Sequence, residues 1–254
     1  MPTSVPEERR PVRKPRKTAT LLAQRIVGEI TAQDLAPGTP LRAERDMLEQ
    51  YGVARGTLRE ALRFLEMQGV ITIKTGPGGG PVVSRPESRH LASTIAMMLQ
   101  LRHASFRSVL EARAVLEPAL ARLAAERITK EELEQLSQVQ HEMRDRIGDL
   151  DGFLAGNVEF HRLIADAAGN QVFALVIASI NWICDATALG VRYSAESQQV
   201  VVDEHARIYK AIASGNPDRA GAAMSMHIAD FSEYLEKRYP SVLDEPLRWD
   251  QIDG

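Results

Sequence analysis

Three histidines in the second half of the sequence have spacings that bring them to one depth of a helical hairpin. His205 lies 11 residues before Asn216, and His227 lies 11 residues after it. In an antiparallel hairpin that turns at Asn216, each would lie roughly 16 Å from the turn, because an α-helix rises about 1.5 Å per residue. Asn157 and His161, four residues apart, share one face of another helical pattern. These four side chains are therefore candidates for one site.

The chemistry open to this group is metal binding. Imidazole nitrogens are common ligands of divalent transition metals. Three histidines and the amide oxygen of Asn157 would leave coordination positions for water or for the carboxylate of a small ligand. An amide oxygen is a weaker metal ligand than a carboxylate, so Asn157 is expected to be the weakest ligand of the four. The other three histidines, His90, His103 and His141, are interpreted as polar residues without a metal role.

Helices must position these residues, and the sequence after residue 87 contains only amphipathic helical patterns. A capping box of Thr129 and Glu132 begins one helix, and Asn216 with Pro217 begins another. Short connections between long helices predict an antiparallel all-α bundle. The predicted helices cover residues 88–101, 106–127, 129–147, 149–168, 170–188, 196–214 and 217–238. After Pro240 we find no periodicity and expect a loosely held tail.

Two arginines of this half are candidates for binding an anionic effector. Arg113 lies on a helix rich in Ala, Val and Leu, and a guanidinium inside a bundle needs an anionic partner. An internal ion pair with Glu117, one turn later, is an equally good explanation of Arg113. Arg192, between two helices, is the weaker candidate. Trp182, Phe173, Ile183 and Cys184 are expected to be buried core residues.

The first half of the sequence has the spacing of a helix-turn-helix. Two short helical patterns meet at the turn Gly52-Val53-Ala54, and the second places Arg55 and Arg59 on one face. Cationic side chains at the start of a second helix suit the major groove, because Arg pairs with guanine edges and phosphates. A helix is expected over residues 20–34. Two β-rich runs, 70–74 and 81–84, flank a Gly-rich tip and predict a β-hairpin wing.

Charge is divided unevenly along the 254 residues. Residues 1–86 carry 14 Lys and Arg against 9 Asp and Glu, a net charge of +5, whereas the remainder carries 17 against 25, a net charge of −8. DNA binding should therefore be confined to the first part. Residues 1–17 are basic and rich in proline, and we expect a disordered tail. Without a secretory signal or a long apolar run, the sequence predicts a cytoplasmic protein.

At these residues the first half resembles the winged helix of the GntR superfamily of bacterial transcription regulators. The matching residues are Pro37-Gly38, Leu41, Glu44-Arg45, Gly52-Val53, Arg55, Thr57-Leu58-Arg59-Glu60-Ala61-Leu62, Leu65 and Gly69. The resemblance implies DNA contacts from a set of residues on the two helices of the helix-turn-helix and on the wing: Arg45, Arg55, Gly56, Thr57, Arg59, Thr75 and Gly76. Arg42, Ala54 and Gly56 depart from the usual residues of the family.

The second half resembles the FCD effector domain of the FadR branch of that superfamily. The matching segments are Arg113-x-x-x-Glu117-Pro118, Asn157-x-x-Phe160-His161, Ala168-Gly169-Asn170, Glu204-His205-x-x-Ile208, Ala211-Ile212-x-x-Gly215 and Met224-x-x-His227. The resemblance implies a divalent metal, zinc or nickel above all, that helps to bind a small carboxylate. Many members have Asp where this chain has Asn157.

The sequence thus predicts a mainly α protein, with a winged helix-turn-helix domain over 18–86 and an all-helical effector and dimerisation domain over 87–240. Residues 241–254 form the expected tail. We expect a homodimeric regulator, acting as a repressor on a pseudo-palindromic operator, because two half-sites multiply affinity. The alternative is a metal-dependent hydrolase with a DNA-binding appendage. No general base is evident for it, since Glu159 and Glu204 are expected to point to other helix faces. An architectural DNA-binding protein without an effector would leave the histidine spacing unexplained.

Overall fold

The structure is a computed structural model that describes residues 18–76, 78–184 and 191–251. The chain divides between Glu87 and Ser88 into two compact units. The basic tail expected at residues 1–17 lies outside the described residues.

The first unit is a three-helix core with a hairpin. Its elements are α1 (Thr18–Ala32), α2 (Glu44–Tyr51), α3 (Arg55–Met67), β1 (Ile71–Lys74) and β2 (Gly80–Val83). Leu58, Leu62 and Leu65 of α3 are buried against Ile26 of α1 and Met47 of α2, because helical spacing puts the leucines on one face. Helix α1 occupies 18–32 in place of the expected 20–34.

Glycine makes the turn between α2 and α3. Gly52 caps α2 in the left-handed conformation, with φ of 62°, and its N–H donates to the carbonyl of Leu48. A side chain at such a φ would be strained, so glycine allows the tight change of direction that a helix-turn-helix requires. Arg55 begins α3 directly after the turn.

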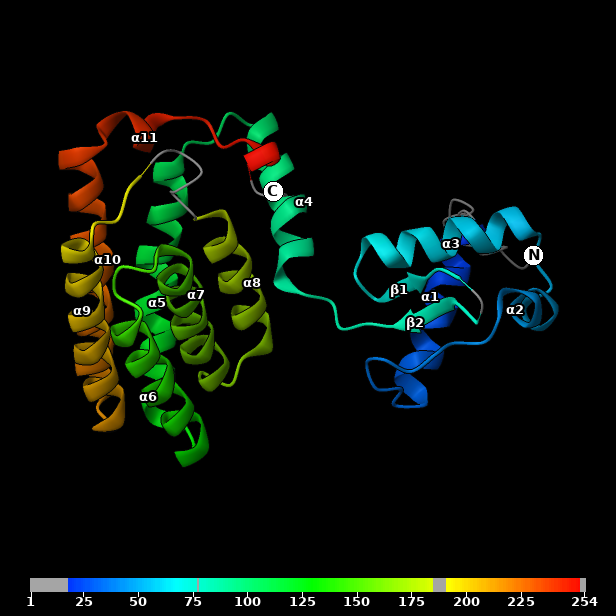
Figure 1. Cartoon of the computed structure of the whole chain (residues 1–254), viewed down its shortest axis with the longest axis horizontal. Helices are drawn as coiled ribbons and strands as arrows, with labels where there is room; N and C mark the ends of the chain where they lie inside the picture. The colour runs from blue at the N-terminus through cyan, green and yellow to red at the C-terminus, as the bar shows by residue number, and fades with distance from the viewer. Residues whose placement is uncertain (1–17, 77, 185–190, 252–254) are drawn as a thin grey trace, which may run out of the picture. The chain divides into compact units, whose positions relative to one another are not determined.

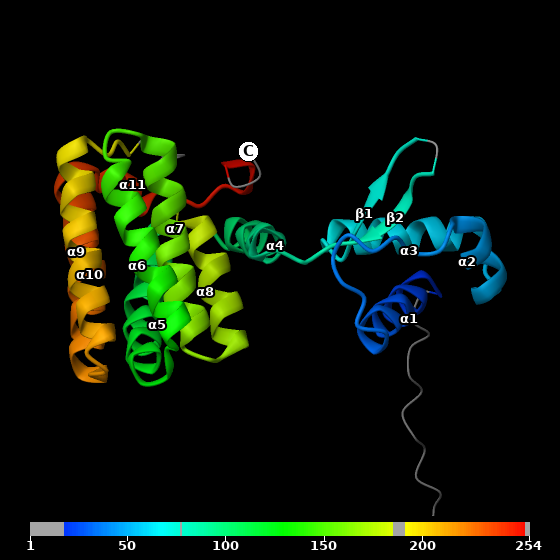
Figure 2. The same cartoon turned by 60° about the horizontal axis from the view of Figure 1, so that its bottom comes forward.

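The wing is an antiparallel pair of β1 and β2, with Ile71 opposite Val83 and Lys74 opposite Gly80. Figure 2 shows this hairpin extending beyond the body of α3. Ile71, Val82 and Val83 are buried at its base, and Pro40 forms an isolated bridge to Val82. The hairpin base is therefore anchored in the core, while the described residues of its tip, 75, 76, 78 and 79, are exposed.

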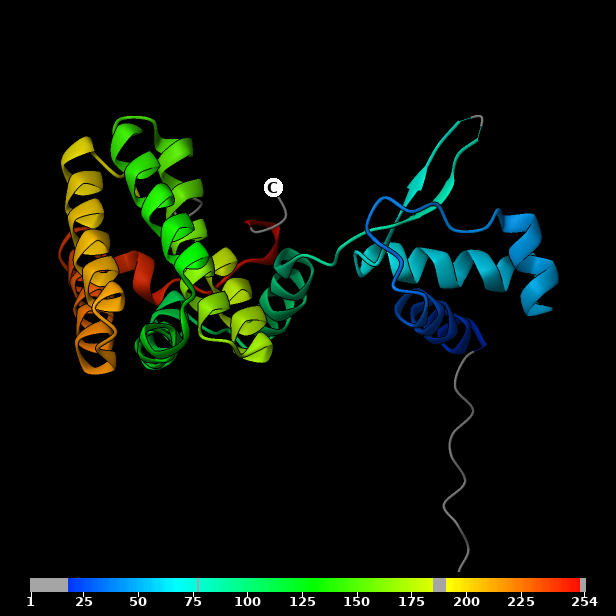
Figure 3. The same cartoon turned by 90° about the horizontal axis from the view of Figure 1, so that it is seen from below.

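The second unit is a helical bundle. Its elements are α4 (Ser88–Leu101), α5 (Phe106–Arg127), α6 (Lys130–Asp145), α7 (Leu150–Ala167), α8 (Gln171–Ile183), α9 (Ala195–Ala213), α10 (Pro217–Arg238), α11 (Pro240–Asp244) and the 3₁₀ helix η2 (Trp249–Gln251). Helix α5 packs against α7, α8, α9 and α10 and lies inside the bundle (Figure 1). Figure 3 shows α9 beside α10 and α6 beside α7.

Local sequence explains where these helices begin. The capping box at Thr129 is present, since its hydroxyl accepts from the N–H of Glu132 and the Glu132 carboxylate accepts from the N–H of Thr129. Asn170 and Asn216 cap α8 and α10 with their side-chain oxygens. The helix expected over 170–188 ends earlier, at Ile183, and residues 185–190 lie outside the described residues.

Two large apolar clusters, with a smaller one where α5, α7 and α8 meet, hold this unit together. One surrounds Phe153 and Phe160 of α7, with Met224 of α10 in contact. The other joins Phe106 of α5 to Leu235 of α10. Burying each such aromatic side chain stabilises the fold by about 1.5–3 kcal/mol. The first cluster surrounds the level at which the histidines lie, so the site is built into rigid packing.

The segment after Pro240 differs from the loosely held tail that we expected. It forms α11, and Val242, Leu243 and Leu247 are buried in the second cluster. The N–H of Leu247 donates to the carbonyl of Ala104, and that of Phe106 to the carbonyl of Glu245. These apolar residues follow no helical or strand period, which is why the pattern did not predict their burial.

Candidate metal centre, pocket and DNA-binding surface

The three histidines converge inside the bundle. His161 comes from α7, His205 from α9 and His227 from α10, and all three are buried. One nitrogen from each imidazole lies within 4.8 Å of the others. The Nε2 atoms of His161 and His227 are 3.3 Å apart. The hairpin of α9 and α10 thus brings His205 and His227 to one level, as their equal distance from Asn216 predicts.

Two buried glutamates face the outer nitrogens of this cluster. Oε2 of Glu204 lies 2.7 Å from Nδ1 of His227. A carboxylate oxygen of Glu117 is in close contact with Nδ1 of His161, outside regular hydrogen-bond geometry. A carboxylate only accepts, so both contacts favour a proton on Nδ1 and leave a lone pair on Nε2.

The two Nε2 lone pairs then face each other across 3.3 Å. Two acceptors in that arrangement repel and cannot share a hydrogen bond. Two nitrogens bound to one tetrahedral zinc at about 2.0–2.1 Å would lie about 3.3–3.4 Å apart. The donor set therefore fits a divalent cation, with His161 and His227 oriented by carboxylates.

His205 supplies a second indication of a metal site. Its ring stacks on Phe160, with ring centroids 4.0 Å apart, and neither ring nitrogen has a hydrogen-bond partner among the described residues. Burial lowers the pKa of His205 well below its usual value, and His227, His161 and Arg113 lower it further. The imidazole is therefore neutral, which is the form that binds metals. Burial likewise lowers the pKa of His161, although the Glu117 carboxylate opposes this.

Arg113 forms a buried ion pair with Glu117 on α5. Burial alone would raise the pKa of Glu117, but Arg113 and then His161 hold it far below its usual range. Burial would lower the pKa of Arg113, which Glu117 and Cys184 raise instead. A guanidinium nitrogen of Arg113 also lies 3.5 Å from Sγ of Cys184. The internal ion pair that we weighed for Arg113 is present, and the same side chain lines a cavity.

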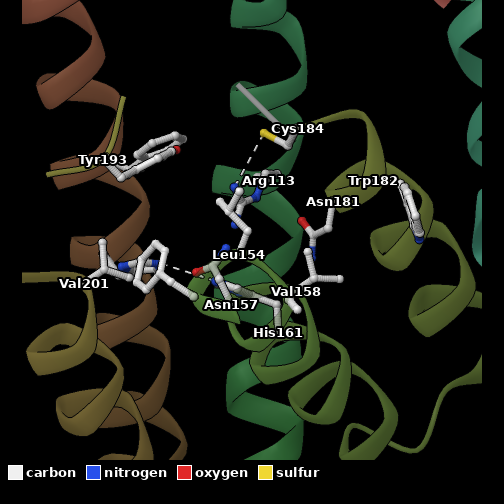
Figure 4. Close-up of a pocket in the computed structure, with 14 residues that line it drawn as sticks. Arg113, Leu154, Asn157, Val158, His161, Asn181, Trp182, Cys184, Tyr193 and Val201 are labelled. Atoms are coloured by element: carbon white, nitrogen blue, oxygen red, sulfur yellow. Dashed lines mark hydrogen bonds between the residues drawn. The ribbon is translucent and has the colours of Figure 1, made fainter. Parts of the chain in front are cut away.

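That cavity of about 410 Å³ adjoins the histidines (Figure 4). Its polar wall includes Arg113, Asn157, Asn181, His161 and His227. The apolar wall is formed by Phe153, Leu154, Val158, Trp182, Val201 and Phe231. A volume of this size suits a small organic molecule, and two of the three imidazoles face it.

The remaining predicted residues lie in different surroundings. Asn157 lies half-buried at the cavity wall, four residues before His161 on α7. Arg192 is exposed and is not among the residues that line the cavity. Its N–H donates to the hydroxyl of Tyr239, and its carbonyl accepts from the hydroxyl of Tyr234. His141 is exposed and contacts the carbonyl of Ser137.

Four side chains expected in the core have mixed outcomes. Ile183 and Cys184 are buried as expected. Trp182 and Phe173 are 41% and 42% exposed, so that expectation was wrong for both. Phe173 lies in the first turn of α8, and Trp182, half a turn away around the helix, borders the cavity.

Sequence reasoning missed three polar residues of this region. Glu204 was expected to point away from the site and instead contacts His227 on the next helix. Glu117 was assigned only to Arg113 and also contacts His161. Asn181 was not considered, although it and Ser179 are the only polar residues between Val172 and Cys184. A polar residue that interrupts an apolar run is the signal from which Asn181 could have been identified.

The predicted DNA-contacting residues lie on α2, α3 and the wing tip. Arg45, Arg55, Gly56, Arg59, Thr75 and Gly76 are exposed, and Thr57 is half-buried. Arg59 lies 3.5 Å from Glu44, and Arg45 lies 3.4 Å from Asp46. Such exposed ion pairs are weak and can exchange for phosphate or base contacts. In the described part of the chain, Arg55 has no ion pair.

A helix-turn-helix with a β-hairpin wing, followed by an all-helical unit, defines the class of winged-helix DNA-binding proteins that carry a second, helical domain. Residues 18–79 match the family described as bacterial regulatory proteins, gntR family, and residues 108–230 match the FCD domain.

Proteins similar to the whole chain point to the same family. The chain is 31% identical over 228 residues to the HTH-type transcriptional repressor NanR of Cronobacter sakazakii, covering 87% of this chain and 85% of that protein. It is 29% identical over 207 residues to the HTH-type transcriptional regulator LutR of Bacillus subtilis, covering 80% and 94%. A solved Streptococcus agalactiae GntR structure aligns with a TM-score of 0.64 at 26% identity, covering 85% of this chain and 99% of that one.

The chain therefore belongs to the GntR family and is a DNA-binding transcription regulator with an FCD domain. The predicted resemblance and fold class are confirmed. The family and its relatives indicate a regulator rather than an enzyme, which removes the hydrolase alternative. None of the described helices is both long enough and apolar enough to cross a membrane.

Proposed function

We propose that the helical unit binds a divalent metal through His161, His205 and His227, and that a small carboxylate bound beside it changes the affinity of the winged helix for DNA. The observation that carries this proposal is the pair of Nε2 atoms 3.3 Å apart, each with a carboxylate at its Nδ1. Zinc and nickel are among the metals that suit a set of imidazoles. When bound, the metal supplies a positive charge at the cavity wall.

The cavity beside the histidines supports the binding of a negatively charged ligand. His161 and His227 line it, so a coordination position left open by the histidines would face the cavity. Asn157, on the same wall, could complete the site or give way to the ligand. Arg113 adds a fixed positive charge that Glu117 offsets. A carboxylate is the anionic group that small metabolites most often offer to such a site.

The DNA-binding unit would act within a homodimer on a pseudo-palindromic operator. One winged helix makes few base contacts, and two half-sites multiply affinity. We assign operator contacts to residues within 18–86 and effector binding and dimerisation to 87–240. The relatives named as repressors support repression, with the effector releasing the operator. Such a protein acts in the cytoplasm, where its DNA is.

Metal analysis of the purified full chain tests the first part of this proposal. One equivalent of metal per chain, lost in His205→Ala, is the expected result. Failure of zinc, nickel and manganese to bind with better than millimolar affinity would refute it. A thermal-shift screen of small carboxylic acids on the metal-loaded protein tests the second part. Stabilisation by an acid that vanishes in His205→Ala is expected.

A further inference from the structure

We infer that Asn181 recognises a second polar group of the effector, and that the effector is a carboxylate carrying a neutral hydroxyl or amide group. This inference rests on the proposed function, in which a carboxylate binds beside the histidines that line the cavity. It adds the chemical class of the rest of the ligand.

Asn181 is the buried polar residue of the cavity whose role the metal site does not explain. It lies on α8, is 7% exposed and lines the cavity. Neither Oδ1 nor Nδ2 of its amide has a hydrogen-bond partner among the described residues. Figure 4 shows the amide pointing away from Trp182 and into the pocket.

An unpaired buried amide is costly, because the donor and the acceptor have both lost their hydrogen bonds to water. The rest of this stretch of α8 is apolar apart from Ser179, whose hydroxyl bonds to backbone carbonyls. An apolar residue at position 181 would avoid the cost in a folded protein without a ligand. The amide is therefore best explained by a partner that enters the cavity.

The partner must satisfy both halves of the amide. A hydroxyl group or another amide can donate to Oδ1 and accept from Nδ2. A carboxylate could only accept, and would leave Oδ1 facing a negative oxygen. An ammonium group could only donate. Arg113, the arginine that lines the same cavity, is already paired with Glu117 and lies close to Cys184, which also favours a neutral group over a second anion.

The apolar wall fits the body of such a ligand. Leu154, Val158 and Phe153 line the same cavity as Asn181 and the two histidines. A short carbon chain in contact with them would carry a carboxylate at one end and the hydroxyl or amide at the other. Because such a ligand would contact both the histidines and Asn181, an acid with only one polar group should bind less tightly.

The test uses the zinc-loaded full chain and three series of straight-chain acids of three to eight carbons. The series are the unsubstituted acids, the acids with a terminal hydroxyl and the acids with a terminal amide. Dissociation constants are measured by titration calorimetry. At the best chain length, the hydroxyl or amide acid should bind about tenfold more tightly than the unsubstituted acid of equal length, since two neutral hydrogen bonds are gained.

Asn181→Leu should remove that preference and keep the affinity for the unsubstituted acid. Gln171→Leu, which replaces an exposed amide at the start of the same helix, should keep the preference and serves as the matched control. The comparison of acids on the unaltered protein stands even if Asn181→Leu does not fold.

Equal affinity of the three series at every length would overturn the inference and leave the proposed carboxylate site standing. The same holds if Asn181→Leu keeps the preference. If zinc binds but no acid of any series does, the effector part of the proposed function fails together with the inference.

Discussion

Glu204 and His227 form a buried carboxylate–imidazole pair between α9 and α10, with 2.7 Å between Oε2 and Nδ1. Glu204 is the sequence neighbour of His205, yet it reaches the histidine of the facing helix. One turn of α9 therefore contributes both a candidate ligand and the group that orients another. The contact fixes the proton of His227 on Nδ1 and directs Nε2 towards the other imidazoles.

Glu204→Gln should weaken metal binding about 10- to 100-fold, because the neutral amide oxygen still accepts from Nδ1 but lacks the carboxylate charge that favours a bound cation. Competition with a chelator of known affinity measures the change. Glu196→Gln, an exposed position on the same helix, is the control and should bind metal as the unaltered protein does. Equal affinities in the two variants would remove Glu204 from the site.

Metal removal should lower the melting temperature of the bundle. A metal present at about 100 times its dissociation constant stabilises the folded state by about 2.7 kcal/mol. Because the three imidazoles come from three helices, that free energy holds α7, α9 and α10 together. Calorimetric scans with and without chelator measure the difference. The difference should disappear in His205→Ala and persist in His141→Ala, which changes an exposed histidine.

The metal-free protein should lose stability as the pH falls below about 6.5. Burial lowers the pKa of His205 well below its ordinary 6.5, so the unfolded chain takes up a proton there that the folded chain does not. Stability therefore rises with pH through this range and falls as the pH drops from 6.5 towards 5.5. Urea unfolding at several pH values, compared with His205→Leu, isolates this contribution. If the unfolding free energy of His205→Leu depends on pH as strongly as that of the unaltered protein, His205 makes no such contribution.

Arg55→Ala should weaken specific operator binding by about 1–3 kcal/mol and relax discrimination at one base pair. Arg55 is exposed at the start of α3 with no competing ion pair in the described residues. Arg102→Ala removes the same charge from an exposed site in the other unit and is the control. Binding to operator and to random DNA is measured by fluorescence anisotropy. Equal losses on both DNAs would show that Arg55 contacts only phosphates.

Helical periodicity was sufficient to predict the faces of the histidines. His205 and His227 face one another because equal spacing from Asn216 puts them at one level, and His161 shares its helix face with Asn157. The α2–α3 turn and the wing were predictable for a similar reason, since Gly52 and the Gly-rich tip have local conformational requirements.

Contacts that depend on side-chain torsions between helices were not predictable. The helix position of Glu204 does not reveal that its carboxylate reaches α10, and the position of Asn181 reveals burial but not its unpaired amide. The burial of Val242, Leu243 and Leu247 depends on a surface that distant helices create. The spacing of apolar residues along the chain gives no indication of such a surface.

The most direct test measures operator affinity of the zinc-loaded protein with and without a saturating carboxylic acid identified by thermal shift. The operator is DNA that the protein selects from a random pool. Binding of the acid should weaken operator affinity by about fivefold or more, the usual range for coupling between sites. His205→Ala should bind the same DNA and fail to respond. Operator affinity that is unchanged by a bound acid in the zinc-loaded protein would contradict the proposed coupling.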